Sequence, residues 1–294
     1  MKDSIEKAEV LIEAIPYIQK FSGCTVVVKY GGSAMVNPEL KKSVVKDLAM
    51  LKYLGLNIVV VHGGGKDISS FLERIGKKSK FVDGQRVTDE ETAAVAEMVL
   101  SGSISKMIVQ ELEDAGIMAV GINGKDGHLL QCSRKPGPKG EDIGFVGEVE
   151  HVNTSLVRNL MSEGYVPVVS PVGFGNDGKT YNINADYCAS ALAGALGAQK
   201  LVFLTDVEGI LRDKDDPSTR IARLTRSQAV DYLANGVIKG GMIPKVECCL
   251  SALEHGVTSV HVLDGRLPHS MLLEIFTTKG IGTMVVKDDE ENQL

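Results

Sequence analysis

The chain has 294 residues, of which 44% are hydrophobic and 24% are charged, an ordinary composition for a globular protein. Its net charge is −6, only 5% of its residues are aromatic, and it has no run of basic residues, which argues against a nucleic-acid surface. The longest apolar runs, at 25–28 and 58–61, are far shorter than the roughly 20 residues of a bilayer span. We therefore expect neither nucleic acid nor a membrane as a partner.

The first 21 residues have charges throughout their apolar stretch, unlike a secretory signal, so we expect a cytoplasmic protein. Isoleucines recur there at helical spacing around Pro16, which predicts an amphipathic helix kinked at the proline. Its apolar face either folds back on its own domain or pairs with another subunit. The cysteines have no CxxC spacing, so we predict reduced, mostly buried thiols at Cys24, Cys132, Cys188, Cys248 and Cys249.

From residue 25 onward, strand-length apolar runs alternate with helical patterns. Alternation of this kind predicts βαβ units and a parallel sheet covered on both faces. The expected fold is α/β: a three-layer αβα open sheet of about eight mainly parallel strands with an extra N-terminal helix. We predict strands at 25–30, 57–62, 119–123, 165–172, 200–206 and 259–265, and helices at 37–55, 67–78, 186–198 and 242–256.

The predicted helix at 37–55 begins with Asn37 and Pro38 and stops at Gly55, as helix boundaries often do. Residues 125–150 are rich in glycine, proline and charge, which indicates either a hairpin or flap at the rim of a site or a plain surface excursion. A composition shift near residue 196 suggests a lobe boundary there, which divides the chain into an N-terminal helix (1–21), an N-lobe (22–195) and a C-lobe (196–294).

Two of the predicted strands end in glycine-rich turns, VVVKYGGS (26–33) and VVVHGGGK (59–66). Backbone N–H groups in such a turn, with a helix N-terminus behind them, favour an anion. Glycine can also serve a tight turn for steric reasons alone. Neither turn has the spacing of a Walker A loop or of GxGxxG, which argues against the commonest nucleotide fingerprints and against a dinucleotide oxidoreductase.

Charged residues accompany these turns. Lys29 lies in an apolar strand, where an unpaired ammonium is costly, Arg86 suits bidentate capture of a carboxylate, and Lys245 follows a glycine pair at a helix start. Asp186 opens another helix in the motif YNINAD, either as a site residue or as a cap or early-turn acid. The structural alternatives are a strand-end lysine for Lys29, a solvated arginine for Arg86 and a surface lysine for Lys245.

In order along the chain, the lysine strand with its glycines, HGGG, GQRVTD, YNINAD, LTDVEGIL and GGMIPK resemble the amino-acid kinase family, and within it the N-acetylglutamate kinases. The resemblance covers residues 22–286, and GQRVTD with YNINAD are its most specific motifs. It implies the amino-acid kinase fold and transfer of the γ-phosphoryl group of ATP to the side-chain carboxylate of N-acetyl-L-glutamate, a step of arginine biosynthesis. Lys66 departs from the small residue or proline of many relatives, and we assign it no catalytic role.

The resemblance also implies roles for individual residues. Lys29 and Lys245 would flank the transferring phosphoryl group, and Asp186 would organise both lysines. Mg²⁺ would be carried mainly by the ATP phosphates, with no metal held by the protein. The implied substrate-binding residues are Gly31, Gly32, Gly63, Gly64, Gly65, Arg86, Asn182 and Asn184, and the implied ATP-binding residues are Thr205, Asp206, Val207, Glu208, Gly209, Ile210, Lys239 and Gly240.

Arginine-inhibited members of the family resemble this chain in their N-terminal helix and in a pattern like HSMLLEIFTTKGIGT (269–283). The resemblance implies that L-arginine binds between helix and C-lobe, through Tyr17, His269, Glu274 and Gly280. Alternatively, His269 and Glu274 are ordinary residues of an exposed helix. The implied assembly is a homo-oligomer, a dimer or a hexamer, and a PII-type protein is a further candidate partner. Another small-acid kinase, or a non-catalytic arginine sensor, remains an alternative function.

Overall fold

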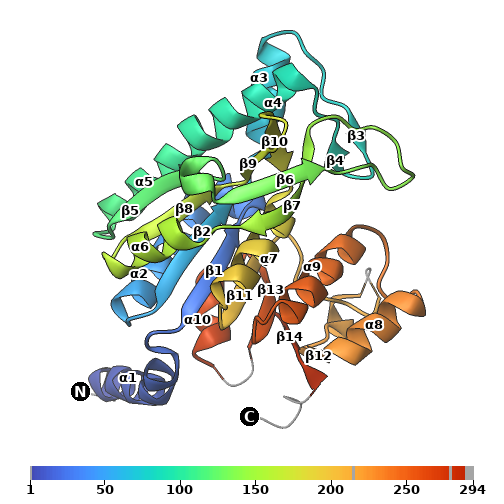
Figure 1. Cartoon of the computed structure of the whole chain (residues 1–294). Helices are drawn as coiled ribbons and strands as arrows, with labels where there is room; N and C mark the ends of the chain where they lie inside the picture. Colours follow the sequence, from blue (N-terminus) through green and yellow to red (C-terminus); the bar gives the residue numbers. More distant parts are fainter. Residues whose placement is uncertain (1, 214–215, 278–279, 289–294) are drawn as a thin grey trace.

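The computed structural model describes residues 2–213, 216–277 and 280–288. Its centre is an eight-stranded sheet in the order β12-β14-β13-β11-β1-β2-β8-β5 (Figure 1). Neighbouring strands are parallel except β13 and β14, which confirms the predicted open, mainly parallel sheet. The strands are β1 (Thr25–Tyr30), β2 (Asn57–His62), β5 (Ala119–Asn123), β8 (Val166–Ser170), β11 (Lys200–Thr205), β12 (Arg223–Thr225), β13 (Ser259–Asp264) and β14 (Thr283–Val286).

Both faces of the sheet are buried. Successive side chains of a strand point to opposite faces, and accordingly Val27 belongs to one hydrophobic core while Val26 and Val28 belong to the other. Residues of α6 to α9 fill the first core, and residues of α2 to α5 and α10 fill the second, so the predicted three layers are confirmed. The helices are α2 (Pro38–Tyr53), α3 (Gly65–Arg74), α4 (Glu90–Glu97), α5 (Ser105–Asp114), α6 (Ser155–Ser162), α7 (Ala185–Leu196), α8 (Arg226–Ala234), α9 (Ile243–Glu254) and α10 (Ser270–Ile275).

Local signals in the sequence set several of these boundaries. Asn37 accepts hydrogen bonds from the first N–H groups of α2, Pro38 is its first residue, and Gly55 follows it with φ +87°, as predicted. The predicted strand at 165–172 is instead divided into β8 and β9 (Val172–Gly175). The division falls at Pro171, which has no N–H to continue a sheet ladder. All five cysteines are free, and four are buried while Cys24 is half-buried.

Residues 125–150 contain a hairpin, which agrees with the first of the two predicted alternatives, a hairpin or flap, and not with a plain surface excursion. Its strands β6 (Leu130–Arg134) and β7 (Val146–Val152) are antiparallel and close into a small four-stranded barrel with β9 and β10 (Thr180–Ile183). The barrel was not predicted, because its strands are short. A second hairpin, β3 (Phe81–Val82) with β4 (Gln85–Arg86), carries the predicted substrate-binding Arg86.

Helices α4 and α5 are joined by a seven-residue π-helix, η2 (Met98–Ile104), into one helix at 90–114. By length and mean hydropathy this helix is the one candidate membrane span among the described residues. Half of its most apolar window is buried inside the protein, and Leu100, Ile108 and Leu112 are part of the second core. A core helix satisfies the same criteria, so this is weak evidence for a span.

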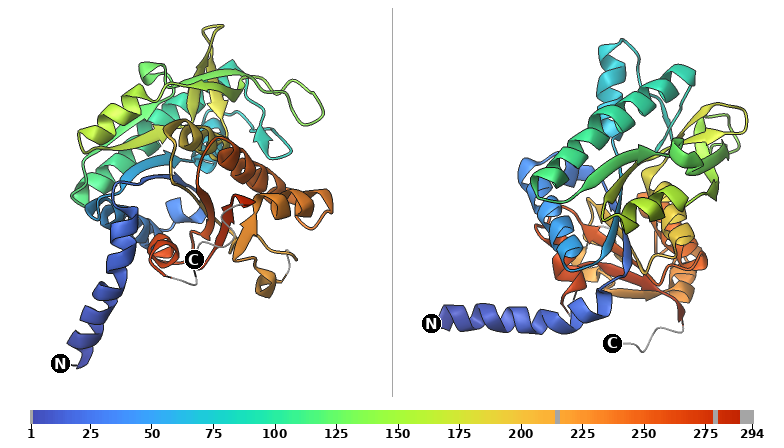
Figure 2. Two further views of the ribbon diagram at one scale, coloured as in Figure 1. Left: turned by 60° about the horizontal axis from the view of Figure 1, so that its bottom comes forward. Right: turned by 60° about the vertical axis from the view of Figure 1, so that its left-hand side comes forward.

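Helix α1 (Lys2–Phe21) projects from the rest of the molecule (Figure 2) and contains Pro16 without interruption. Among the side chains of α1 that the structure describes, those near its C-terminal end pack on the body: the Tyr17 ring lies edge-on to Phe276, 6.4 Å between centroids, and Phe21 packs on the second core. Ile12 and Ile15 are exposed. This part of the apolar face is therefore not folded back on its own domain, which removes one of the two predicted alternatives for it.

Candidate active site

The cavity of interest lies at the carboxyl edge of the central sheet. There β1 lies between β2 and β11, and both neighbours are parallel to it. The connection from β1 leads to β2 on one side of β1, and the later strand β11 lies on the other side, so the strand order reverses at β1. Open α/β sheets leave a crevice at such a switch point. A cavity of about 220 Å³ lies there, and the predicted residues that line it are Lys29, Gly63, Gly64, Gly65, Arg86, Asn182, Asn184 and Asp186.

Asp186 brings the two predicted lysines together. Its Oδ1 lies 3.0 Å from Nζ of Lys29, and its Oδ2 lies 2.8 Å from Nζ of Lys245. Burial by itself would raise the pKa of the Asp186 carboxyl, but the charges of both lysines and the hydrogen bond from Lys245 outweigh burial and hold the pKa below its ordinary value. Two ammonium groups and one carboxylate leave one net positive charge, which suits the site to an anion.

The starts of two helices place this trio. Asn184 is the N-cap of α7, and its side chain accepts the N–H of Asp186 at 2.8 Å. Asp186 is therefore not the cap; it lies in the first turn of α7, as the alternative of an early-turn acid states, and its carboxylate is paired with the two lysines. Lys245 lies in the first turn of α9, which packs against α7. The alternative of a surface lysine is wrong for Lys245, whose side chain is 22% exposed.

The two glycine turns are held side by side, since the N–H of Gly63 donates to the carbonyl of Tyr30 at 2.8 Å. A Cβ on Gly31 would lie 2.8 Å from Nζ of Lys29. Gly32 has φ +67°, and a Cβ there would lie 2.7 Å from Oδ1 of Asp206. The positive φ and the close Asp206 carboxylate give Gly32 a steric reason, whereas Gly31 is extended and meets only the flexible end of the Lys29 side chain. Neither glycine lines the cavity, while Gly63 to Gly65 do.

Arg86 is buried, with 7% of its surface exposed, so the alternative of a solvated arginine is wrong. Its guanidinium donates to the carbonyl of Gly65 at 2.7 Å and to the hydroxyls of Ser69 and Ser79 at 2.9 and 2.6 Å. The Phe81 ring lies 4.7 Å away. A guanidinium has five N–H donors; three are used within the described part of the chain, which leaves two for a ligand.

The asparagines differ in their surroundings. Asn182, on β10, is half-buried, and its Nδ2 lies 3.4 Å from Oγ1 of Thr88. Asn184 has its carbonyl oxygen committed to the cap of α7. Asn182 is therefore the one with polar atoms more available to a ligand in the cavity.

Sequence reasoning missed His62, the last residue of β2. It is fully buried directly before the three glycines, and its ring lies 2.8 Å from the Gly63 carbonyl oxygen and 2.9 Å from Oγ of Ser170. The available signal was a polar residue at the end of the buried strand NIVVVH. Lys66, by contrast, is exposed.

The predicted ATP-binding residues lie on the other side of β1. The Thr205 hydroxyl, at the end of β11, donates to the Leu263 carbonyl at 3.1 Å. Asp206 accepts the N–H of Ser33 at 2.7 Å and so stabilises the first glycine turn. Of the remaining predicted residues, Gly209 and Ile210 are buried, Val207 is half-buried, and Glu208, Lys239 and Gly240 are exposed.

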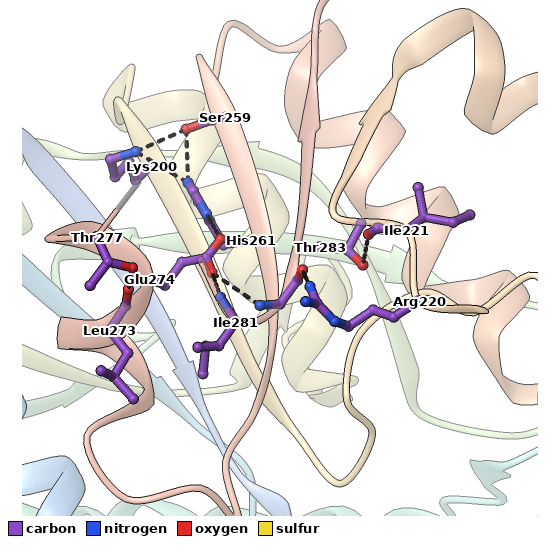
Figure 3. A network of polar contacts seen from close by, with 11 residues as sticks. Lys200, Arg220, Ile221, Ser259, His261, Leu273, Glu274, Thr277, Ile281 and Thr283 are labelled. Carbon is purple, nitrogen blue, oxygen red and sulfur yellow. Dashed lines mark hydrogen bonds and ion pairs between the residues drawn. The ribbon is translucent and has the colours of Figure 1, made fainter. Parts of the chain in front are cut away.

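The predicted arginine-binding Glu274 lies on α10 and has a 5% exposed side chain, so it is not a residue of an exposed helix. Its Oε1 lies 2.8 Å from Nδ1 of His261, and its Oε2 accepts the N–H groups of Ile281 and Gly282 (Figure 3). Burial would raise the pKa of Glu274, but His261 and the two amides lower it to about 2. A Cβ on the predicted Gly280 would lie 2.8 Å from the same Oε2.

His261 connects Glu274 to a buried lysine. Burial and then the charge of Lys200 lower the pKa of His261 to about 4, so the ring is neutral and its Nδ1–H donates to the carboxylate. Nε2 then accepts from Lys200 at 3.2 Å (Figure 3). The predicted His269 is separate from this chain of contacts, because its ring is paired with Asp47 at 2.6 Å. Residues 278–279 of the predicted pattern lie outside the described residues.

Comparison with known proteins shows the family of the chain. The model of the amino acid kinase family matches residues 25–264. An acetylglutamate kinase from Caldanaerobacter subterraneus subsp. tengcongensis is 53% identical over 99% of this chain and 97% of its own length.

Two solved structures of N-acetylglutamate synthase from Neisseria gonorrhoeae are similar over 96% of this chain. One, with coenzyme A and N-acetyl-glutamate, has a TM-score of 0.84 at 27% identity, and the other, with coenzyme A and L-arginine, has 0.79 at 26%. This chain spans 63% and 65% of the length of those synthase chains. From the family model and the near full-length relative, the chain belongs to the amino acid kinase family and is a kinase.

Proposed function

We propose that the protein transfers the γ-phosphoryl group of ATP to the side-chain carboxylate of N-acetyl-L-glutamate, giving N-acetyl-L-glutamyl 5-phosphate for arginine biosynthesis. The main observation in support of this proposal is the trio of Lys29, Asp186 and Lys245 beside a cavity lined by Gly63 to Gly65 and Arg86. An acetylglutamate kinase 53% identical over nearly the whole chain supports this acceptor.

The acceptor needs no general base. A carboxylate has an ordinary pKa of about 4 and is already ionised at neutral pH, so catalysis consists of positioning and charge neutralisation. Lys29 and Lys245 neutralise the charge that spreads over the transferring phosphoryl oxygens. Asp186 keeps the two ammonium groups in place, and Gly64 and Gly65 offer N–H groups at the start of α3, where helical amides have no intrahelical acceptor.

The remaining cavity residues hold the rest of the acceptor. Arg86 binds a carboxylate of N-acetyl-L-glutamate with its two remaining donors, and Asn182 binds the acetamido group. ATP lies on the β11 side, along residues 205–210 and beside Lys239 and Gly240, in the C-lobe of the predicted division. Magnesium carried on the ATP phosphates would neutralise part of their charge, with no ligand required from the protein.

We further propose feedback inhibition by L-arginine at the junction of α1 with α10. Support comes from the contact of Tyr17 with Phe276, from the buried carboxylate of Glu274, and from the arginine complex of a similar synthase. Each oxygen of Glu274 already has a partner in the protein, so a guanidinium must use the remaining lone pairs or displace those partners. His269 would have to leave Asp47 or bind arginine through its other ring nitrogen.

The exposed Ile12 and Ile15 of α1 support the proposal that this helix pairs with another subunit and joins dimers into a hexamer. Deletion of residues 1–20 is then expected to leave an active dimer that L-arginine does not inhibit. Sedimentation and an activity titration with arginine test this expectation. A truncated protein that arginine still inhibits would contradict it. Binding of a PII-type protein and a cytoplasmic location remain predictions from the sequence.

The first test is ADP release with N-acetyl-L-glutamate or free L-glutamate as acceptor, with and without arginine. Turnover on the acetylated acceptor alone, suppressed by arginine, supports both proposals. Turnover on glutamate alone or on both acceptors moves the assignment to another small-acid kinase. A complete lack of turnover favours a non-catalytic arginine sensor.

A further inference from the structure

His62 is a fully buried imidazole in contact with the glycine turn of the cavity. Desolvation lowers the pKa of His62 to about 4, so the ring is neutral at pH 7 and has one N–H proton. Nδ1 lies 2.8 Å from the Gly63 carbonyl oxygen, which can only accept, and so Nδ1 carries that proton. Nε2 is then the acceptor for the Ser170 hydroxyl at 2.9 Å.

This arrangement fixes a peptide plane. The Gly63 carbonyl shares a planar trans peptide with the N–H of Gly64, which points the opposite way. The other peptide of Gly63 is also held, because its N–H donates to the Tyr30 carbonyl. With both sides of Gly63 restrained, the direction of the Gly64 N–H is set. Gly64 is the N-cap of α3 and lines the cavity together with Lys29.

Ser170 also lies against the π-helix η2. Its Oγ is 3.3 Å from the Leu100 carbonyl oxygen, but its one proton is donated to His62, so this is a contact and not a second hydrogen bond. The Leu100 carbonyl accepts the N–H of Ser105, five residues further on. The side chain of Leu100 lines the cavity, and a Cβ on Gly64 would clash with Leu100 and Ile104. The turn therefore packs directly on a π-helical segment, a feature often found at functional sites.

We propose that His62 and Ser170 are positioning residues for phosphoryl transfer, which fix the Gly63 carbonyl and thereby direct the Gly64 N–H at the reacting oxygens. This inference rests on the proposed function, since it assigns those oxygens to the acceptor carboxylate and the transferring phosphoryl group. Neither residue exchanges a proton with the substrate. Their contribution is an N–H donor held in place before the reaction, which stabilises charge as it develops.

The test compares His62→Gln, Ser170→Ala and the double variant with a matched control, Ser105→Ala. Ser105 is equally buried, but its hydroxyl has no hydrogen-bond partner in the described part of the chain. Each single variant is expected to lower kcat about tenfold to a hundredfold, the effect of a misplaced catalytic group, and to change KM for ATP less than twofold. Ser105→Ala is expected to keep the wild-type kcat.

Because both residues act through one peptide, the double variant is expected to be no slower than the slower single variant. The ratio of wild-type to Ser170→Ala kcat is expected to be constant from pH 6 to 8.5, since His62 does not titrate there. Additive losses, a ratio that follows a titration in that range, or equal rates for Ser170→Ala and Ser105→Ala would each overturn the proposal.

A second readout needs no substrate. Amide hydrogen exchange at residues 63–65, followed by mass spectrometry, is expected to be faster in Ser170→Ala than in Ser105→Ala, and equal rates would contradict the positioning role. A wild-type protein that fails to phosphorylate N-acetyl-L-glutamate would instead contradict the proposed function, while the exchange result would still report whether Ser170 holds the turn.

Discussion

Replacement of Asp186 by Asn tests the arrangement at the centre of the site. The change keeps the shape of the side chain but removes the charge that holds two lysines, 3.0 and 2.8 Å away. The three side chains are 12 to 22% exposed, so water screens them only partly. Lys29 and Lys245 are then expected to move apart, because their like charges no longer share a counterion.

The magnitude follows from the two contacts. The contact with Lys245 is a hydrogen bond, whereas the contact with Lys29 is an ion pair. A hydrogen bond to a charged group contributes about 1.5–3 kcal/mol, so its loss alone removes about 1.5–3 kcal/mol from the positioning of the lysines. Each 1.36 kcal/mol of barrier is about tenfold in rate. We therefore expect kcat to fall by about 10 to 10² or more.

The assay is coupled ADP release with saturating ATP and N-acetyl-L-glutamate, together with thermal unfolding of each protein. Glu97→Gln is the matched control, because Glu97 pairs with Lys125 at 2.7 Å but does not line the cavity. The control is expected to keep its kcat within about twofold of wild type. A folded Asp186→Asn protein with kcat within threefold of wild type would refute the reasoning.

Two further predictions concern buried charges. Arg86→Lys removes donors to Gly65, Ser69 and Ser79. In initial-rate measurements, KM for N-acetyl-L-glutamate is therefore expected to rise about tenfold or more, while KM for ATP stays unchanged. An equal rise in KM for ATP would contradict this prediction. Glu274 has its pKa lowered from 4.5 to about 2, so its stabilisation is complete above pH 4.5 and is lost as the pH falls toward 2. In urea unfolding, Glu274→Gln is expected to be less stable than wild type at pH 7 and to approach it near pH 3, and a constant difference would be contrary to this assignment.

Much of the fold follows from local patterns in the sequence. The runs at 25–30 and 57–62 are apolar on both faces, as strands buried between two helical layers must be, and their observed bounds are the predicted ones. Asn37 and Pro38 set the start of α2 because capping is a local interaction. The small barrel could not be predicted in this way, since its short strands pair with segments distant in sequence, such as β7 with β10.

The site was predictable in its residue types but not in its contacts. Lys29 stood out as a charge in an apolar strand, and Asp186 by its place at a helix start. The pairing of Asp186 with Lys245, 59 residues further on, depends on how α7 packs against α9. His62 was missed because its partner Ser170 is 108 residues away, and no local pattern reveals a buried hydrogen bond between two strands.

The attachment of α1 has a geometric consequence. The 20 residues of α1 make a rod about 30 Å long, and the described contacts with the body lie near its C-terminal end, at Tyr17 and Phe21. A rigid rod held at one end magnifies small rotations: a tilt of about 10° at Phe21 displaces the far end by about 5 Å. Displacements of side chains around Phe276 and Lys200 by fractions of an ångström would therefore become displacements of several ångströms at the tip.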